Sequence, residues 1–519
     1  MGNVHGLDPA TPVLVGVGQF AERPGEPGYA ARSAVGLAAE AAHRALADAG
    51  IAAAEVDTIA GVRQFEISTP RAKAPLGRAD NFPRAVARRV GADPRRAVLE
   101  VAGGQAPQHL VTEFAGLIAA GGPASPRVVL LVGSEAISTA RVFADAPDRP
   151  DFTEQVGGQL EDRGYGLKGL ASAYTLAHGL VGAPPQYALF ENARRARLGL
   201  SRADYARAMG ALFAPFTTVA AANPYAAAPV ERDAAELVTV TDRNRIIADP
   251  YPRFVVARDQ VNQAAAVVLT SVGEARRLGI PEEKWVFLAG HADVRERDLL
   301  DRQDLSASPA AVLAVRHALD LAGRSLDEIA TFDLYSCFPI AVFNVCDGLG
   351  LAPDDPRGLT LTGGLPFFGG AGNNYSMHAI AETVAALRGG PGAYGLVGAN
   401  GGALSKYSVG VYTTRPTGWR ADGSDRLQAE IDSWLAVPVA ERADGEARIE
   451  TFTVVPRRDG RRRAVVVGRL NGDGRRFLAT GVEGDGAGAD DLLGLLAGEE
   501  PIGQRIRVRA TEAGNVATP

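Results

Sequence analysis

The sequence has only two cysteines in 519 residues, Cys337 and Cys346, nine positions apart. This scarcity excludes a disulfide framework and a metal site made of cysteine alone. Lys and Arg (54) do not outnumber Asp and Glu (60), so the chain lacks the positive surplus that favours a nucleic-acid partner. The glycine patterns of mononucleotide and dinucleotide loops are also missing. We therefore expect no nucleic-acid partner, no metal and no resident cofactor.

Long apolar runs are lacking as well. None reaches the roughly 20 residues of a membrane span, and the N-terminal MGNVHGLDPATP does not have the basic-then-apolar order of a signal peptide. The sequence therefore predicts a cytoplasmic protein without a membrane span. Its 46% hydrophobic and 22% charged content is that of a globular protein, and its length predicts two or three domains.

The first 275 residues read as an α/β half, which we place at 9–275. Three apolar runs are expected as strands: 13–17, 97–102 and 128–136. An amphipathic helix is expected at 31–49, ended by Gly50. The stretch 138–229 instead holds short helices and many prolines. It predicts an excursion over the carboxyl edge of the sheet, where open α/β sheets bind ligands.

The same order begins again in a second half, placed at 276–416. It contains a strand at 329–334, a glycine-rich loop at 363–372, a helix at 377–388 and a strand pair across a Gly-Gly turn. The repeated order indicates an internal duplication. A polar linker, 417–444, leads to alternating strands and Asp-Gly turns at 445–519, which predict a small β-barrel.

Polar side chains stand at two helix starts of the second half. Tyr335, Ser336 and Cys337 follow a strand, and Pro339 suits the first turn of a helix because that turn tolerates a missing N–H. Asn373 and its neighbours precede the second helix in the same way. Free N–H groups at helix starts favour negative charge, so the pattern predicts two helix starts that together receive an anion or a thioester.

The motifs GVGQF, the turn at 97–108, the stretch 329–382 and the closing GANGG resemble, in this order, the thiolase superfamily over about residues 9–415. The sterol-carrier-protein-type thiolases and their thiolase-like relatives are the most similar in pattern. The C-terminal module resembles an OB-fold domain. The resemblance implies a duplicated thiolase fold, two βαβαβαββ halves, with a fused OB-like barrel and an acyl-CoA ligand.

When the family's motifs are aligned with this sequence residue by residue, the positions of the family's catalytic cysteines hold other residues. Gly103 stands where thiolases carry the nucleophile, and YSCF (335–338) matches their Asn-Glu-Ala-Phe or His-Asp-Cys-Phe motif. Their Gly-His-Pro motif corresponds to 369–371 or to 372–374, without a histidine in either register; the second register places Asn373 as in ketoacyl synthase III. Their late cysteine corresponds to Ala399 or Asn400.

Each candidate residue has a functional and a structural interpretation. Cys337 is a thiolate activated by a helix start or a small buried hydrophobe. Asn373 donates to a thioester carbonyl in an oxyanion hole or caps its helix. Tyr375 and His378, three apart on a helix, relay a proton or belong to the core. Tyr335 is an acid/base or a strand-end aromatic.

The glycine turns are expected to contribute backbone. Close approach or binding of a carbonyl oxygen is assigned to one set of residues, Gly103, Gly104, Asn400, Gly401 and Gly402. His178, in the covering excursion, is a further candidate for the pocket.

Three functions stay open. The first is an acyltransferase of the acetyl-CoA acetyltransferase kind, in which any acyl-enzyme must form on Cys337 or Cys346. The second is a non-covalent retro-aldol lyase acting on β-hydroxyacyl-CoA through Tyr335 or Tyr375, similar to steroid side-chain aldolases, which lack the nucleophile and work with an OB-fold partner. The third is an acyl-CoA-binding protein without turnover. Thiolases are commonly dimers through the N-terminal sheet edge, so a homodimer is possible, although the C-terminal domain is expected to obstruct it.

Overall fold

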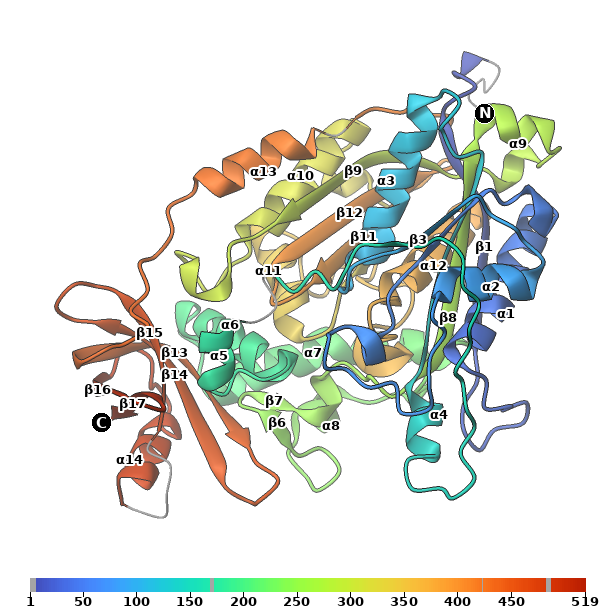
Figure 1. The fold of residues 1–519 in the computed structure, drawn as a ribbon. Coiled ribbons are helices and arrows are strands. Elements are labelled where there is room, and N and C mark those ends of the chain that lie inside the picture. The colour runs from blue at the N-terminus through green and yellow to red at the C-terminus, as the bar shows by residue number, and fades with distance from the viewer. Residues whose placement is uncertain (1–5, 169–171, 422, 482–486) are drawn as a thin grey trace.

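The computed structural model describes residues 6–168, 172–421, 423–481 and 487–519. Two α/β halves lie against each other, and a closed barrel sits at one end next to α5 and α6 (Figure 1). The last strands of the chain belong to this barrel, while the N-terminal strand β1 lies at the far side of the molecule (Figure 1).

The N-terminal half is built on a six-stranded sheet. Its order is β1 (Pro12–Ala21), β8 (Asn262–Ser271), β4 (Val128–Ala136), β2 (Thr58–Gly61), β3 (Arg96–Leu99) and β5 (Glu161–Asp162). Helices α1 (Ala34–Ala49) and α2 (Phe82–Val90) cover its outer face with a shared apolar core. Gly50 ends α1 in the left-handed conformation (φ 70°), which glycine adopts without strain, as the sequence predicted.

The C-terminal half repeats this plan on a four-stranded sheet. Its order is β10 (Thr331–Leu334), β11 (Tyr394–Gly401), β12 (Lys406–Thr413) and β9 (Phe287–Arg295), with α10 (Pro309–Ala322) and α11 (Pro339–Leu349) outside. The stretch 359–362 takes the place of a further strand. It is held beside β10 by the Leu334 N–H, which donates to the Leu359 carbonyl, and by the carboxylate of Asp333.

Two buried helices, α3 (Ala106–Ala120) and α12 (Tyr375–Gly389), contribute side chains to the core that both sheets share. Figure 1 shows them between the sheets. Helix α12 begins earlier than the sequence predicted, at 375 rather than 377. The turns that precede α3 and α12 lie next to each other in the core between the sheets.

The excursion between β4 and β8 spans 137–261, so its predicted end at 229 was wrong. It contains α4 (Ile137–Val142), β5, α5 (Ala173–Ala177), α6 (Ala183–Arg197), α7 (Arg202–Ala222), α8 (Ala234–Val238), β6 (Ile246–Ala248) and β7 (Tyr251–Pro252). The elements after 229 are too short to show a periodic pattern in the sequence. After β8 comes α9 (Val272–Arg277).

The C-terminal strands close into a barrel in the order β13 (Gly445–Pro456), β14 (Arg462–Leu470), β15 (Arg476–Thr480), β17 (Gly514–Thr518) and β16 (Arg505–Thr511), with α14 (Ala487–Leu496). The barrel has its own core, but Val465, Val467 and Leu478 belong to the main core of the chain. The linker contains a helix, α13 (Ser424–Ser433), which its polar composition did not predict.

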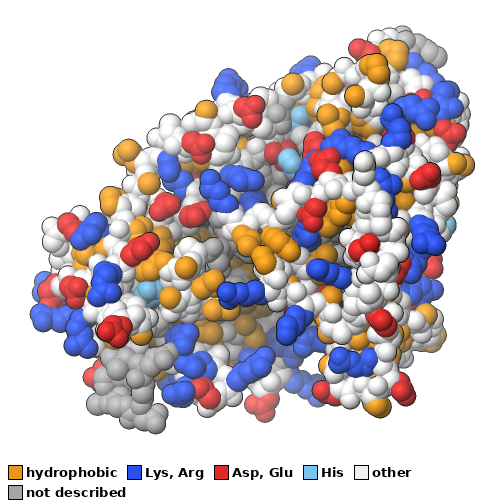
Figure 2. Space-filling model, in the orientation of Figure 1, with side chains coloured by type: hydrophobic (Ala, Val, Ile, Leu, Met, Phe, Trp, Pro, Cys, Tyr) orange, Lys and Arg blue, Asp and Glu red, His pale blue; other side chains and the backbone are white. Residues whose placement is uncertain are grey.

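Acidic and basic side chains are interspersed on the face drawn in Figure 2, without a continuous field of one sign. Among the described residues, no helix is long and apolar enough to cross a membrane. The structure therefore shows neither a basic stripe on this face nor a candidate membrane helix in its described parts.

Candidate active site where four turns meet

Four turns that are distant in sequence meet at the starts of α3 and α12. The Gly103 N–H donates to Asn373 Oδ1 at 2.9 Å, and the Ser376 hydroxyl donates to the Gly104 carbonyl at 2.5 Å. The Tyr335 N–H donates to the Gly398 carbonyl at 3.1 Å, next to the GANGG turn. The sequence candidates 103–104, 335–337, 373–376 and 399–402 therefore belong to one region.

Tyr335 reaches across this junction to Gly104. A Cβ on Gly104 would lie 2.1 Å from the Tyr335 hydroxyl oxygen, so only glycine leaves room for the phenol. Within the described part of the chain, no group bonds to this hydroxyl, and the residue is 8% exposed. Burial raises the pKa of Tyr335, so the group is a neutral phenol at physiological pH.

Cys337 is a neutral thiol rather than an activated thiolate. Burial raises its pKa to about 12, although contacts with Tyr187 and with Asn400, whose Nδ2 lies 3.9 Å from Sγ, act in the opposite direction. The nearby start of α11 does not offset burial, because the Glu191 carboxylate accepts the Ile340 N–H at 2.8 Å. The prediction that two helix starts together receive a ligand is therefore wrong for the start of α11.

Asn373 holds the Gly103 turn in place. Besides accepting from Gly103, its amide donates to the Arg63 carbonyl at 2.7 Å and to the Ser68 hydroxyl at 2.8 Å. Both amide hydrogens are thus used, which contradicts the predicted oxyanion role. Helix capping is not its role either, because Asn374 occupies the N-cap of α12.

Tyr375 and His378 do not form the predicted relay. The Tyr375 hydroxyl is fully buried and donates to Asp333 at 3.0 Å. His378 Nδ1 donates instead to Gln19 Oε1 at 2.7 Å, and burial lowers the pKa of this histidine to about 3. Both side chains therefore belong to the core and have separate partners, which was the structural alternative given for them from the sequence.

The glycines of two turns make room for Gln105, which sequence reasoning missed. A Cβ on Gly103 or Gly401 would lie 2.1 or 1.8 Å from Gln105 Oε1. This oxygen and Asn400 Oδ1 are buried and accept no hydrogen bond from the residues that the structure describes. Gly402 instead uses its carbonyl to accept from the Tyr187 hydroxyl at 2.8 Å.

The junction therefore combines unengaged donors and acceptors. Tyr335 offers a hydroxyl, and Gln105 and Asn400 offer amide oxygens, of which Asn400 is the residue beside the neutral thiol of Cys337. A site of this kind hydrogen-bonds a polar ligand and moves a proton, but it contains no ready nucleophile.

Lys406 is a second residue that the sequence did not single out. Its ammonium donates to the carbonyls of Ala102 (3.2 Å) and Gly166 (2.6 Å), and so ties the excursion to the turn before α3. Burial lowers its pKa to about 8. The only signal in the sequence is a lysine within an otherwise apolar strand. His178, by contrast, lies away from the junction, where its Nε2 accepts the Asn515 N–H of the barrel.

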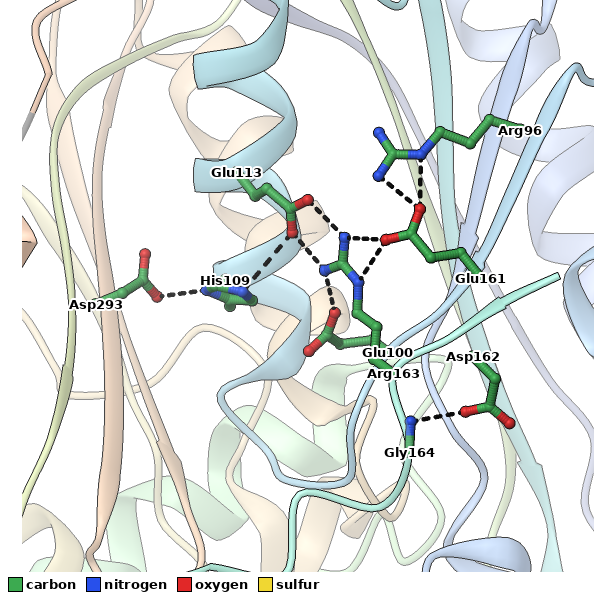
Figure 3. A network of polar contacts seen from close by, with 9 residues as sticks. All are labelled: Arg96, Glu100, His109, Glu113, Glu161, Asp162, Arg163, Gly164 and Asp293. Carbon is green, nitrogen blue, oxygen red and sulfur yellow. Dashed lines mark hydrogen bonds and ion pairs between the residues drawn. The ribbon is translucent and has the colours of Figure 1, made fainter.

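An ionic network stands behind the turn (Figure 3). Arg163 reaches Glu100 at 2.6 Å and Glu113 at 2.5 Å, and His109 lies 3.3 Å from Asp293. Burial would lower the pKa of His109, but the surrounding carboxylates outweigh it and raise the pKa to about 9. Glu100, His109 and Glu113 are grouped closely enough to ligate a metal ion, yet the Arg163 guanidinium already supplies the positive charge there.

A cavity of about 590 Å³ borders the segments that hold the turn. Arg63 and Tyr165 line it; the Arg63 carbonyl accepts from Asn373, and the Tyr165 carbonyl accepts the Ala102 N–H. Its volume is within the range of small-molecule sites.

Comparison with known proteins gives matches over the whole chain. A monomeric SCP2-thiolase-like protein type 1 from Mycobacterium smegmatis is 53% identical, with 99% of each chain covered and a TM-score of 0.83. The profile of the thiolase-like protein type 1 additional C-terminal domain matches residues 426–513. No curated protein matches.

Two more distant structures share the fold. The Ltp2-ChsH2(DUF35) aldolase is 20% identical over 78% of this chain and 98% of its own, with a TM-score of 0.57. The acetyl-CoA acetyltransferase from Syntrophomonas wolfei is 15% identical over 78% and 99%, with a TM-score of 0.54. The predicted thiolase-like α/β fold with a C-terminal barrel is confirmed.

Proposed function

Because the chain belongs to the SCP2-thiolase-like proteins of type 1, we propose that it acts on a CoA thioester without an acyl-enzyme, as a carbon–carbon lyase in which Tyr335 transfers the proton. One observation carries this proposal. The Tyr335 phenol occupies the space that a side chain on Gly104 would need, at the turn where thiolases carry their nucleophile. A proton-transfer group thus stands at the residue next to Gly103, the expected position of the nucleophile, where Gln105 fills the side-chain space.

The chemistry fits a neutral phenol. Retro-aldol cleavage of a β-hydroxyacyl thioester breaks the Cα–Cβ bond, turns the β-hydroxyl into a carbonyl and leaves the electron pair on the thioester as an enolate. Tyr335 gives its proton to the α-carbon as it receives the proton of the β-hydroxyl, so no net proton is gained or lost. Burial raises the pKa of Tyr335 and keeps the phenol protonated, and the simultaneous exchange of the two protons avoids forming a phenolate.

The amide oxygens of Gln105 and Asn400 would orient the substrate. Each is a buried acceptor without a donor among the described residues, so each suits a substrate hydroxyl. The cavity of about 590 Å³ beside the turn would hold the thioester's carrier arm.

Covalent acyl transfer has less support. Cys337 and Cys346 are the only thiols of the chain, and burial raises the pKa of each to about 12. A thiol of this kind is a poor nucleophile at neutral pH because the thiolate is the reactive form. We therefore expect no thioester adduct on either cysteine when the intact protein is weighed after incubation with acetyl-CoA.

The test compares two tyrosine variants on β-hydroxyacyl-CoA substrates, with release of the carbonyl product as the readout. Tyr335→Phe is expected to lower kcat by about 10²-fold or more, since it removes the proton carrier. Tyr375→Phe is the matched control, because its hydroxyl bonds to Asp333 inside the core. Equal turnover by wild type and Tyr335→Phe would refute the mechanism. Thioester binding without product from any substrate would instead identify a binding protein.

A further inference from the structure

Helix α6 touches both the candidate site and the barrel. Tyr187 and Glu191 lie four residues apart and so share one face of the helix. Tyr187 takes a hydrogen bond from Asn400 Nδ2 at 2.7 Å, and its ring stacks on Phe338 with centroids 4.5 Å apart. This face of α6 is therefore in contact with both the 335–338 turn and the GANGG turn.

Glu191 fixes the start of the helix that follows Tyr335 and Cys337. Its buried carboxylate accepts three hydrogen bonds, from the Ile340 N–H at 2.8 Å, the Tyr251 hydroxyl at 2.7 Å and the Tyr205 hydroxyl at 2.5 Å. A carboxylate on the first turn of α11 opposes the partial positive charge of the helix end. The position of the 335–338 turn is thus coupled to α6 through one buried carboxyl group.

Other residues of α6 are held by the barrel. The Thr451 hydroxyl donates to the Leu189 carbonyl at 2.6 Å, and Asn192 Nδ2 donates to the Phe452 carbonyl at 3.0 Å. Arg195, which is 2% exposed, pairs with Glu500 at 2.9 Å. These contacts are mostly buried and come from strand β13 and from the segment after α14.

We infer that the C-terminal barrel sets the geometry of the Tyr335–Phe338 turn through α6, with Glu191 as the positioning residue. The barrel holds one side of α6 by backbone and side-chain hydrogen bonds, and the other side presents Tyr187 and Glu191 to the turn. The fused module thereby acts as a built-in support of the candidate site. Its relevance to catalysis rests on the proposed function, but the geometric coupling itself does not.

Cys337 reports on this coupling without any substrate. It lies in the turn and is 7% exposed, while Cys346 lies further along α11 and is 1% exposed. The rate at which a disulfide reagent such as 5,5′-dithiobis(2-nitrobenzoate) labels each cysteine in the native protein can be followed by peptide mass mapping. Cys346 then serves as the internal measure of general unfolding.

Glu191→Gln and Thr451→Val are each expected to raise the labelling rate of Cys337 by about tenfold while that of Cys346 stays unchanged, since each removes a buried hydrogen bond. Thr451→Val should add little in the Glu191→Gln background, because both act through one helix. Glu446→Gln, which removes only an exposed ion pair with Arg507 on the barrel, should have no effect.

Tyr251→Phe provides a milder variant if Glu191→Gln does not fold, because it removes one of the three donors to the carboxylate. An unchanged Cys337 rate in Thr451→Val and in the Glu191 or Tyr251 variant would overturn the inference, as would Cys337 and Cys346 rising together. Absence of lyase turnover would leave these rates unaffected, so failure of the proposed function is separable from failure of this inference.

Discussion

The hydroxyl oxygen of Tyr335 lies where a side chain on Gly104 would begin, 2.1 Å from the position of a Cβ on that glycine. The two residues come from different halves of the chain, 231 positions apart by their numbers. The N-terminal half thus has a glycine at this position, and the phenol of Tyr335 from the C-terminal half occupies the space beside it.

Gly104→Ala is expected to destabilise the protein by about 1–3 kcal/mol, because its methyl group would overlap the Tyr335 ring. The unfolding temperature measures this loss. Gly116→Ala, on the helix that Gly104 leads into, is the control, since its Cβ would meet only Trp419 at 3.6 Å. Adding Tyr335→Ala should recover part of the stability lost in Gly104→Ala; full additivity of the two changes would contradict a direct clash.

Asn373→Ala should destabilise the fold by about 1–3 kcal/mol for each buried group that loses its partner, chiefly the Gly103 N–H and the Arg63 carbonyl. Denaturant unfolding provides the measurement. Affinity for acyl-CoA should fall only as far as the turn loosens, because the Asn373 amide has no hydrogen left for a ligand. A large loss of affinity with unchanged stability would restore Asn373 as a ligand-binding residue.

The pH dependence of stability should carry a contribution from Glu191. Burial raises its pKa to about 7 from the usual 4.5, so the folded state keeps a proton that the unfolded chain loses between these values. Its contribution is therefore fully present below about pH 4.5 and is lost as the pH rises through 7. The total is on the order of 3 kcal/mol.

Comparison with Glu191→Gln isolates this contribution, since the remaining groups titrate alike in both proteins. The free energy of unfolding of wild type relative to the variant should decrease from pH 4.5 to 7 and then level off. A difference that does not change with pH would show that the carboxyl group keeps its ordinary pKa.

One edge of the N-terminal sheet is covered by a short strand of the same chain. Strand β5 pairs with β3 at one edge of the N-terminal sheet, and Arg163 next to it binds Glu100 and Glu113. The C-terminal domain, which the sequence suggested as the obstruction, lies apart from β3 (Figure 1). The 53% identical relative is described as monomeric.

Arg163→Ala should therefore loosen β5 and expose the β3 edge, which promotes pairing between chains. We expect a loss of stability of about 3 kcal/mol, in keeping with a mostly buried ion pair left without one partner, and self-association that increases with concentration. Size-exclusion chromatography with light scattering measures the latter. Arg277→Ala, which removes an exposed pair elsewhere, should have the same oligomeric state as the wild type. A monomeric Arg163→Ala protein would show that the ion pairs do not hold the edge.

Local patterns in the sequence determined much of the fold. Strand β4 at 128–136 and the start of α11 at Pro339 lie where the apolar run and the proline predicted them. Apolar runs and helix-start residues act over a few positions, so they can be read without tertiary contacts. The sequence likewise shows that Gly103 stands at the position expected for the nucleophile and that the chain has only two cysteines.

The roles of the polar candidates were decided only by the tertiary structure. Tyr335 and Tyr375 look alike in sequence, yet one hydroxyl is free of described partners and the other bonds to Asp333, 42 positions away. The amide of Asn373 is likewise used by Gly103, 270 positions away. A hydrogen bond depends on distance and direction between groups that folding brings together, and sequence spacing does not encode either quantity. The sequence therefore determined which residue types stand at the motif positions, and the tertiary structure decided which of these side chains have hydrogen-bond partners.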